Sequence, residues 1–261
     1  MQRVEIEIFT ELLHHIGQNA QRLPQQQLTG FLPSVGVEYT RELMVVGRAP
    51  NGWASGWLPQ QLQEPSSVQK VLHETIASVT PPEGILCPRK WVVDLWGTRG
   101  IFNTTYKAAY DPNRSAFWRT IRQVVERFQL ANIHGGPWSS CIAYSNLYKI
   151  APANGGNPSQ GLSTLQLLHC QRLLDLEISI YKPKKILFLT GWLYWAKDLL
   201  PNWTPTATFS TADTFPAFEL VKAIGHMHYG NDGVGKMVVA AHPQCKNESN
   251  WVNEVVRAFQ L

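Results

Sequence analysis

The chain contains five short, uninterrupted apolar runs, at positions 43–47, 91–95, 141–146, 186–190 and 237–241. A continuous apolar run predicts a strand buried on both faces, which is typical of a parallel sheet. Between the runs, apolar residues recur at helical spacing over about 4–20, 66–76, 115–130, 163–181 and 249–259. Strands that alternate with helices predict a three-layer α/β domain.

The segments between these elements are rich in Pro and Gly, and none has the composition of an interdomain linker. We therefore expect a single domain spanning 1–261, with the N-terminal helix at about 4–20 packed on it. Ligands of open α/β sheets bind beyond the carboxyl ends of the strands. Functional residues are therefore expected directly after the apolar runs.

The first candidate motif, GRAPNGW, follows the run 43–47. Its two glycines and its proline form a rigid turn that lets the backbone approach a ligand closely. Glycine and proline are also common in ordinary loops, so this motif alone fits either a ligand-binding turn or an ordinary loop. Its candidate ligand-contacting residues are Gly47, Arg48, Ala49, Pro50, Asn51 and Trp53.

Two further motifs end later strands. Asn146 closes the run 141–146, and its amide offers a donor and an acceptor that match the pairing edge of a pyrimidine. The alternative is an Asn that caps the next turn. His242 follows the last run and has the chemistry to polarise a carbonyl or stabilise an anion, although a lone His is more often structural.

Taken together and in this order, the motifs resemble those of the uracil-DNA glycosylase superfamily. GRAPNG resembles its first loop, SNLYKIAPANGGNPS resembles a strand that ends in a base-reading Asn, KPKKILFLTG resembles its penultimate strand, and His242-Pro243-Gln244 resembles its His-Pro-Ser motif. The resemblance implies a uracil-DNA-glycosylase-like α/β/α sandwich with a sheet of four or five parallel strands. It also implies an enzyme that flips a base out of DNA and cleaves the glycosidic bond of that base. It also implies base contacts by Asn146 and DNA contacts by Lys149, Pro243, Gln244 and Lys246.

The sequence departs from that pattern in three places. The branch closest at the Asn146 run carries four cysteine ligands, whereas the four cysteines here are far apart, so we expect no iron–sulfur cluster, metal or other cofactor. The first motif has Arg48 and Ala49 where many members place an acid that orients water. The residues after His242 are polar, so Gln244 or Lys246 takes the place of an apolar wedge.

Asp94 is the candidate replacement for the missing acid. It interrupts the apolar run WVVDL, where a charge needs a partner or a purpose. The functional interpretation is that Asp94, helped by Asn51, orients the attacking water and faces the sugar. The structural interpretation is a buried salt bridge or a helix-cap partner. An aromatic side chain is expected to stack on the flipped base, and the candidates are Trp53, Trp96 and Tyr148.

The predicted reaction is hydrolysis by a monofunctional DNA glycosylase, which leaves an abasic site. Some superfamily members remove glucosylated hydroxymethylcytosine from phage DNA, and Arg48 with the polar-aromatic stretches 98–110 and 225–232 is compatible with that branch. Two alternatives stay open: a repair uracil-DNA glycosylase, and a catalytically silent DNA-binding module on the same fold.

The composition of the chain bears on its binding partners and its cellular location. With 23 basic and 19 acidic residues, the net charge of +4 permits a polyanionic partner but does not require one. The N-terminus is acidic and amphipathic, unlike a signal peptide, and no apolar run reaches the roughly 18 residues of a membrane span. We therefore expect a cytoplasmic protein that binds DNA and no membrane.

Overall fold

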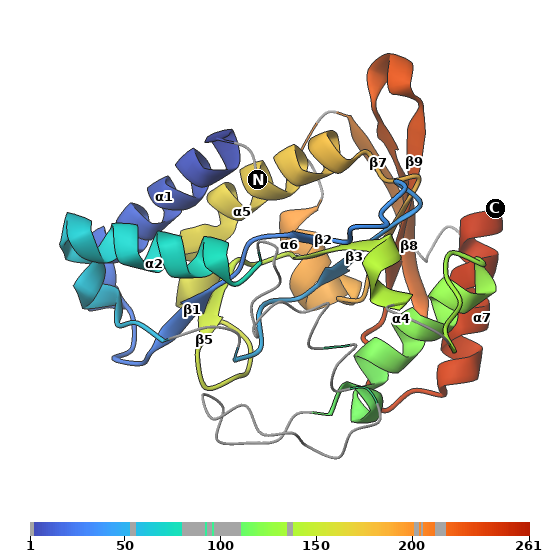
Figure 1. The fold of residues 1–261 in the computed structure, drawn as a ribbon, viewed down its shortest axis with the longest axis horizontal. Coiled ribbons are helices and arrows are strands. Elements are labelled where there is room, and N and C mark those ends of the chain that lie inside the picture. Colours follow the sequence, from blue (N-terminus) through green and yellow to red (C-terminus); the bar gives the residue numbers. More distant parts are fainter. Residues whose placement is uncertain are drawn as a thin grey trace. The chain divides into compact units, whose positions relative to one another are not determined.

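The computed structural model describes residues 3–52, 56–79, 92, 96, 111–134, 138–200, 204, 206–211 and 218–261. Its helices are α1 (Arg3–Gln18), α2 (Pro65–Ala77), α4 (Ala116–Arg127), α5 (Gln160–Tyr181), α6 (Lys197–Leu199) and α7 (Glu248–Gln260) (Figure 1). Its strands are β1 (Leu28–Gly30), β2 (Ser34–Val35), β3 (Leu43–Gly47), β4 (Ile142–Asn146), β5 (Ile150–Pro152), β6 (Lys185–Phe188), β7 (Ala207–Thr211), β8 (Val221–His228) and β9 (Val234–Ala240). The chain is therefore a mixed α/β protein.

The chain divides into two compact units, each built from three separate segments. The first unit comprises Met1–Pro33, Arg48–Cys87 and Ser145–Ile180, and the second comprises Ser34–Gly47, Pro88–Tyr144 and Tyr181–Leu261. The chain passes between the two units repeatedly, and the single domain expected from the sequence stays a prediction.

The seven-stranded sheet has the order β2-β4-β3-β6-β9-β8-β7. Its centre is parallel, because Val45 of β3 pairs with Leu187 of β6, which pairs with Val238 of β9. Its flanks are antiparallel: β2 pairs with β4, and β8 pairs with both β9 and β7. Figure 1 shows β8 and β9 as a long twisted ribbon closed by a tight turn. The predicted sheet of four or five parallel strands is therefore corrected to a mixed sheet.

Four of the five apolar runs are confirmed as strands, namely β3, β4, β6 and β9. Val92, the one described residue of the predicted strand 91–95, is helical and fully buried. The prediction missed β8 because its positions alternate between buried and more exposed, the pattern of an antiparallel strand that has one open face. A search for continuous apolar runs does not detect such a strand.

The core of the second unit lies between the sheet and two amphipathic helices, α4 and α7. On α4, Trp118, Ile121 and Val125 recur on one face and are buried. Phe128, just after α4, meets Phe259 of α7 edge-on at 5.6 Å between ring centroids. Figure 1 shows α4 and α7 side by side. The sheet contributes Leu43, Val45, Leu187, Leu189, Val238 and Ala240 to this core.

The first unit combines α1, α2 and α5 with a two-stranded antiparallel sheet in which Thr29 of β1 pairs with Ala151 of β5. The predicted N-terminal helix is confirmed as α1, which buries Phe9, Leu12 and Ile16 at helical spacing. Gly17 permits a close approach, because a Cβ there would lie 2.7 Å from the Leu62 carbonyl oxygen. Among the described helices, none combines the length and apolar composition needed to cross a bilayer.

Three described cysteines are free thiols in different surroundings. Cys141 and Cys170 are buried, and burial raises the pKa of Cys141 to about 11 and that of Cys170 to about 12. Cys245 is exposed. At pH 8 a thiol with a pKa of about 11 is thiolate in only about one molecule in a thousand. Exposure and ionisation therefore both disfavour reaction at the two buried sites.

We predict that iodoacetamide at pH 8 modifies Cys245 rapidly, and Cys141 and Cys170 only after denaturation. Peptide mapping by mass spectrometry measures each site separately. The Cys245→Ser variant is the control and should lose the rapid phase at that peptide. Rapid alkylation of Cys141 in the native protein would contradict the packing described for the second unit.

Candidate functional site

The loop after β3 is the first place where predicted functional residues gather. Gly47 is the buried last residue of β3, Arg48 is half-buried, and Pro50 is buried. Burial lowers the pKa of the Arg48 guanidinium from its ordinary value, which is so high that the group stays charged at neutral pH. Arg48 therefore brings a cationic group with several donors to a partly enclosed position in this loop.

The loop after β3 is tied to the segment that follows β4, and both belong to the first unit. The Tyr148 N–H donates to the Arg48 carbonyl at 2.9 Å, and the Gly156 N–H donates to the Asn51 Oδ1 at 2.9 Å. Gly52 has a φ of 65°, and a Cβ there would lie 3.2 Å from the Ala153 carbonyl oxygen. The Asn51 side chain thus fastens the two loops together, a role that is additional to the water-holding role predicted for it.

Asn146 is the last residue of β4 and is only 1% exposed. β4 lies beside β3 in the sheet, so the motif predicted to read a base ends a strand adjacent to the one that leads into the GRAPNG loop. A primary amide in this position carries both donor and acceptor atoms, which suits recognition of a planar polar group. The strand-end position predicted for Asn146 is confirmed, and its base-reading role stays a prediction.

Lys149 does not lie where the sequence suggested. Its side chain is 0% exposed, and its Nζ lies 2.7 Å from the Glu177 Oε1, 2.7 Å from the Ser145 Oγ and 2.8 Å from the Asn146 carbonyl oxygen. A phosphate on the protein surface cannot reach an ammonium enclosed in this way. The DNA contact predicted for Lys149 is therefore replaced by a network of internal contacts.

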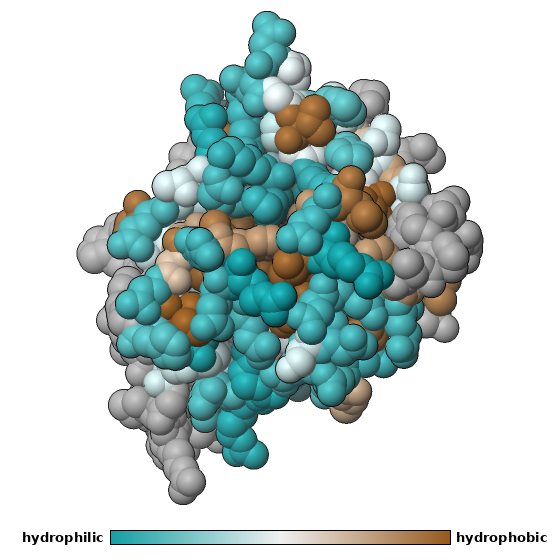
Figure 2. Space-filling view, turned by 90° about the vertical axis from the view of Figure 1, so that its right-hand side faces the viewer, coloured by the Kyte–Doolittle hydropathy of each residue, from teal (hydrophilic) through white to brown (hydrophobic). Residues whose placement is uncertain are grey.

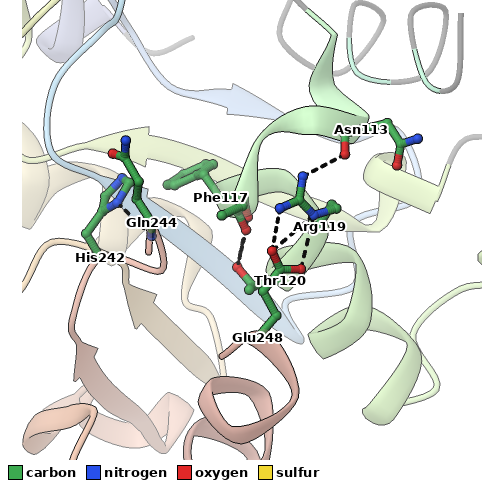
Figure 3. Close-up of polar contacts among 8 residues, drawn as sticks. Asn113, Phe117, Arg119, Thr120, His242, Gln244 and Glu248 are labelled. Atoms are coloured by element: carbon green, nitrogen blue, oxygen red, sulfur yellow. Dashed lines mark hydrogen bonds and ion pairs between the residues drawn. The ribbon is translucent and has the colours of Figure 1, made fainter. Parts of the chain in front are cut away.

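His242 follows β9 in the second unit, and Figure 3 shows its ring beside Phe117 of α4. The two rings stack at 6.2 Å between centroids with an interplanar angle of 27°. The Gln244 backbone N–H donates to the His242 Nδ1 at 3.3 Å. A ring nitrogen that accepts a hydrogen bond carries no proton, so the proton of the neutral imidazole lies on Nε2. His242 can therefore present an N–H donor.

The backbone before His242 is held from three directions. The Trp251 indole N–H donates to the Ala241 carbonyl at 2.7 Å, and the Ala241 N–H donates to Leu220 at 2.8 Å. The Gly191 N–H donates to the Ala240 carbonyl at 2.8 Å, from a φ of 74° that favours glycine. These bonds connect the end of β9 to α7, to the residue before β8 and to the third residue after β6. The backbone that leads into His242 is therefore held in a defined position.

The start of α7 is joined to α4 next to His242. Arg119 donates from its Nε to both Glu248 carboxylate oxygens at 3.1 Å and from its Nη1 to the Asn113 carbonyl at 2.8 Å (Figure 3). This pairing raises the pKa of Arg119. The side chain of Asn247 accepts the Asn250 N–H at 2.9 Å and caps α7. The helix that carries Trp251 is thus fixed at its first turn.

Pro243 is buried, whereas Gln244 and Lys246 are exposed. The Lys246 N–H donates to the Pro243 carbonyl at 3.1 Å, which closes a tight turn. The turn presents a polar and a cationic side chain to solvent directly after His242. Both side chains are accessible to a polyanion, and their predicted DNA contacts stay predictions.

The aromatic candidates for base stacking have different surroundings. Tyr148 is only 4% exposed, so little of its ring faces solvent. Trp96 meets the Trp138 ring at 5.6 Å, and the Arg122 guanidinium carbon lies 5.0 Å above the Trp96 ring. Trp96 therefore packs at the margin of the second unit's core. Trp53 lies outside the described residues.

Two other predictions concern segments away from these motifs. Asp94 and the stretch 98–110 lie outside the described residues. His226 and His228 do not line a loop at the strand ends: they lie on β8 and pair with Lys236 and Val234 at the start of β9. At the rise of a strand, that is roughly 20 Å from the end of β9 that leads to His242. Residues 225–232 thus belong to β8 and the turn that follows it, and their predicted link to a glucosylated substrate stays a prediction.

The roles of several residues that shape these sites could not be predicted from the sequence. Glu177 is one of several polar residues along the helical stretch 163–181, and nothing in the pattern marks it as buried. Gln166 receives the N–H groups of Lys149 and Ile150 at 3.1 and 2.9 Å. Both roles follow from tertiary contacts with the segment after β4, which no local pattern encodes.

Protein families and curated proteins add no independent assignment. The sequence matches no protein-family model and no curated protein. Within the described part of the chain, no three His, Cys, Asp or Glu side chains come together in a way that could hold a metal ion. Function is therefore inferred from the residues themselves.

We predict that Trp251→Phe lowers the free energy of unfolding by about 1–2 kcal/mol, because the Ala241 carbonyl loses its buried donor. Chemical denaturation measures the change. Trp118→Phe, a change of the same kind elsewhere in the same core, is the control and should cost less. Equal losses in the two variants would show that the Trp251 hydrogen bond contributes nothing beyond packing.

Proposed function

We propose that the protein is a monofunctional DNA glycosylase with a three-layer α/β/α fold like that of the uracil-DNA glycosylases. The observation that carries the proposal is the buried Asn146 amide at the end of β4, beside the strand that leads into the GRAPNG loop. The hydrogen bond from the Tyr148 N–H to the Arg48 carbonyl fixes the GRAPNG loop to the segment that follows β4. The order of motifs along the chain supports the same assignment.

In the proposed reaction Asn146 reads the pairing edge of a flipped pyrimidine. The base leaves as an anion while the deoxyribose becomes oxocarbenium-like, so donors near the base lower the barrier. His242 suits this task because its Nδ1 accepts the Gln244 N–H and its Nε2 carries the proton. A neutral donor on a rigid backbone stabilises the developing negative charge without a prior proton transfer.

Water completes the reaction. Asp94 is proposed to orient the water and to face the sugar cation, with Asn51 as the alternative. Lys149, the lysine within the motif, is enclosed by Glu177, Ser145 and Asn146 and is not exposed for attack on the sugar. The absence of an accessible amine in this motif favours direct hydrolysis that leaves an intact abasic strand.

The proposed substrate is glucosylated hydroxymethylcytosine in phage DNA, met in the cytoplasm. A base of this size needs an open pocket with hydrogen-bond donors, and the half-buried Arg48 supplies donors in the first loop. The exposed Gln244 and Lys246 are proposed DNA contacts. The alternatives are a repair enzyme that acts on uracil and a DNA-binding module without catalysis.

The substrate is tested with three matched duplexes that carry uracil, hydroxymethylcytosine or its glucosylated form, each treated with alkali after incubation to reveal abasic sites. We expect cleavage after alkali mainly for the glucosylated duplex, and protection of cells against phages with that DNA. Release of uracil alone would assign the repair function. Tight binding without cleavage of any duplex would assign the silent module.

We predict that Asn146→Ala and His242→Ala each lower the single-turnover rate of base release by about tenfold or more, because each removes a group that acts on charge developed in the transition state. DNA affinity should change much less. Asn231→Ala, an exposed amide in the β8–β9 turn, is the control and should retain the wild-type rate. Unchanged turnover in Asn146→Ala would remove the base-reading assignment.

A further inference from the structure

Lys149 and Glu177 form a buried ion pair in the first unit, and stability of the fold does not require such a pair. Lys149 and Glu177 are both 0% exposed, and the ammonium contacts both carboxylate oxygens, at 2.7 and 2.9 Å. Removing two charges from water is costly, and well-packed apolar side chains often replace such a pair without loss of stability. Stability alone is therefore a weak reason for an ion pair at this place.

The ammonium has a task that an apolar side chain cannot perform. Its three protons match three partners: the Glu177 carboxylate, the Ser145 Oγ at 2.7 Å and the Asn146 carbonyl oxygen at 2.8 Å. Two of these partners are the last two residues of β4. Lys149 therefore reaches back along the chain and holds the peptide unit of the predicted base-reading residue.

Ser145 does not turn this cluster into a nucleophilic site. Its hydroxyl donates to the Glu177 Oε2 at 2.6 Å and accepts from Lys149, and the residue is 0% exposed. A substrate has no access to an oxygen that is enclosed and bonded on both sides. The Ser145–Lys149 pair is thus part of the support of Asn146.

The support is anchored in a long helix. Glu177 lies on α5, and burial raises its pKa while Lys149 and Ser145 oppose that shift. Glu5 of α1 is also fully buried, and its like charge contributes to the raised pKa of Glu177. Gln166, about three turns before Glu177 on α5, accepts the N–H groups of Lys149 and Ile150 and donates to the Ile150 carbonyl at 2.8 Å. The segment 145–150 is thereby fixed to α5 at both ends.

We propose that Lys149 is a positioning residue that fixes the Asn146 peptide unit, and with it the direction of the Asn146 side-chain amide. The inference rests on the proposed function for the role of that amide, but the placement of the amide can be measured without any reaction. A buried amide that must meet a base edge needs a defined orientation, because a displacement of about 1 Å weakens catalysis strongly.

The test is the double variant Lys149→Met with Glu177→Gln, which removes both buried charges together and leaves Ser145 an acceptor. The protein is labelled with ¹⁵N in Asn, and the Asn146 side-chain amide signal is identified by its loss in Asn146→Ala. We expect this signal to shift or broaden in the double variant. Thr75→Val, a buried polar-to-apolar change on α2, is the control and should leave the signal in place.

The second readout is the single-turnover rate of base release, which we expect to fall about tenfold in the double variant with unchanged DNA affinity. An unmoved Asn146 signal in a folded double variant overturns the positioning role, as does a wild-type rate. If the wild type releases no base, the proposed function fails while the amide signal still decides the role of Lys149. If the double variant does not fold, Glu177→Asp keeps both charges, retracts the carboxylate and is judged by the same signal.

Discussion

The buried ammonium of Lys149 is the interaction on which the organisation of the first unit's functional segment depends. It joins the end of β4 to Glu177 of α5. Gln166 on the same helix accepts the N–H groups of Lys149 and of Ile150, the first residue of β5. From this fixed segment Tyr148 donates to Arg48, and the Asn51 side chain accepts from Gly156. The loop after β3 thus takes its position from a helix more than a hundred residues later in the sequence.

The second unit fixes His242 by different means. Strand hydrogen bonds, the Trp251 indole N–H and the stacked Phe117 ring determine where the imidazole lies. The hydrogen bond from Gln244 then selects its tautomer. A donor whose protonation is set by the backbone is suited to stabilising an anion, which is the task that the proposed reaction assigns to it.

The sequence predicted the parts of the fold that depend on local pattern. The runs that became β3, β4, β6 and β9 are continuously apolar because both faces of these strands are covered, and α1, α4 and α7 show helical spacing. The antiparallel ribbon of β8 and β9 was not predicted, because the positions of β8 alternate between buried and more exposed.

The candidate site was predicted less completely than the fold. Asn146 and His242 were found because strand ends are where ligands of α/β sheets bind. The burial of Lys149 was not foreseen, since a lysine after a strand is normally exposed and its partner Glu177 lies on an element with no sequence relation to it. Tertiary pairing of distant charges is the kind of information that spacing and composition do not contain.

The most direct measurement of the central claim is mass spectrometry of the small molecules released from DNA that carries glucosylated hydroxymethylcytosine. The proposed reaction releases the free, intact modified base and leaves an equal amount of abasic sites in the DNA, because the bond broken is the one between base and deoxyribose. Release of glucose alone or of a nucleotide would contradict base excision. So would the release of no base from either this DNA or uracil-containing DNA.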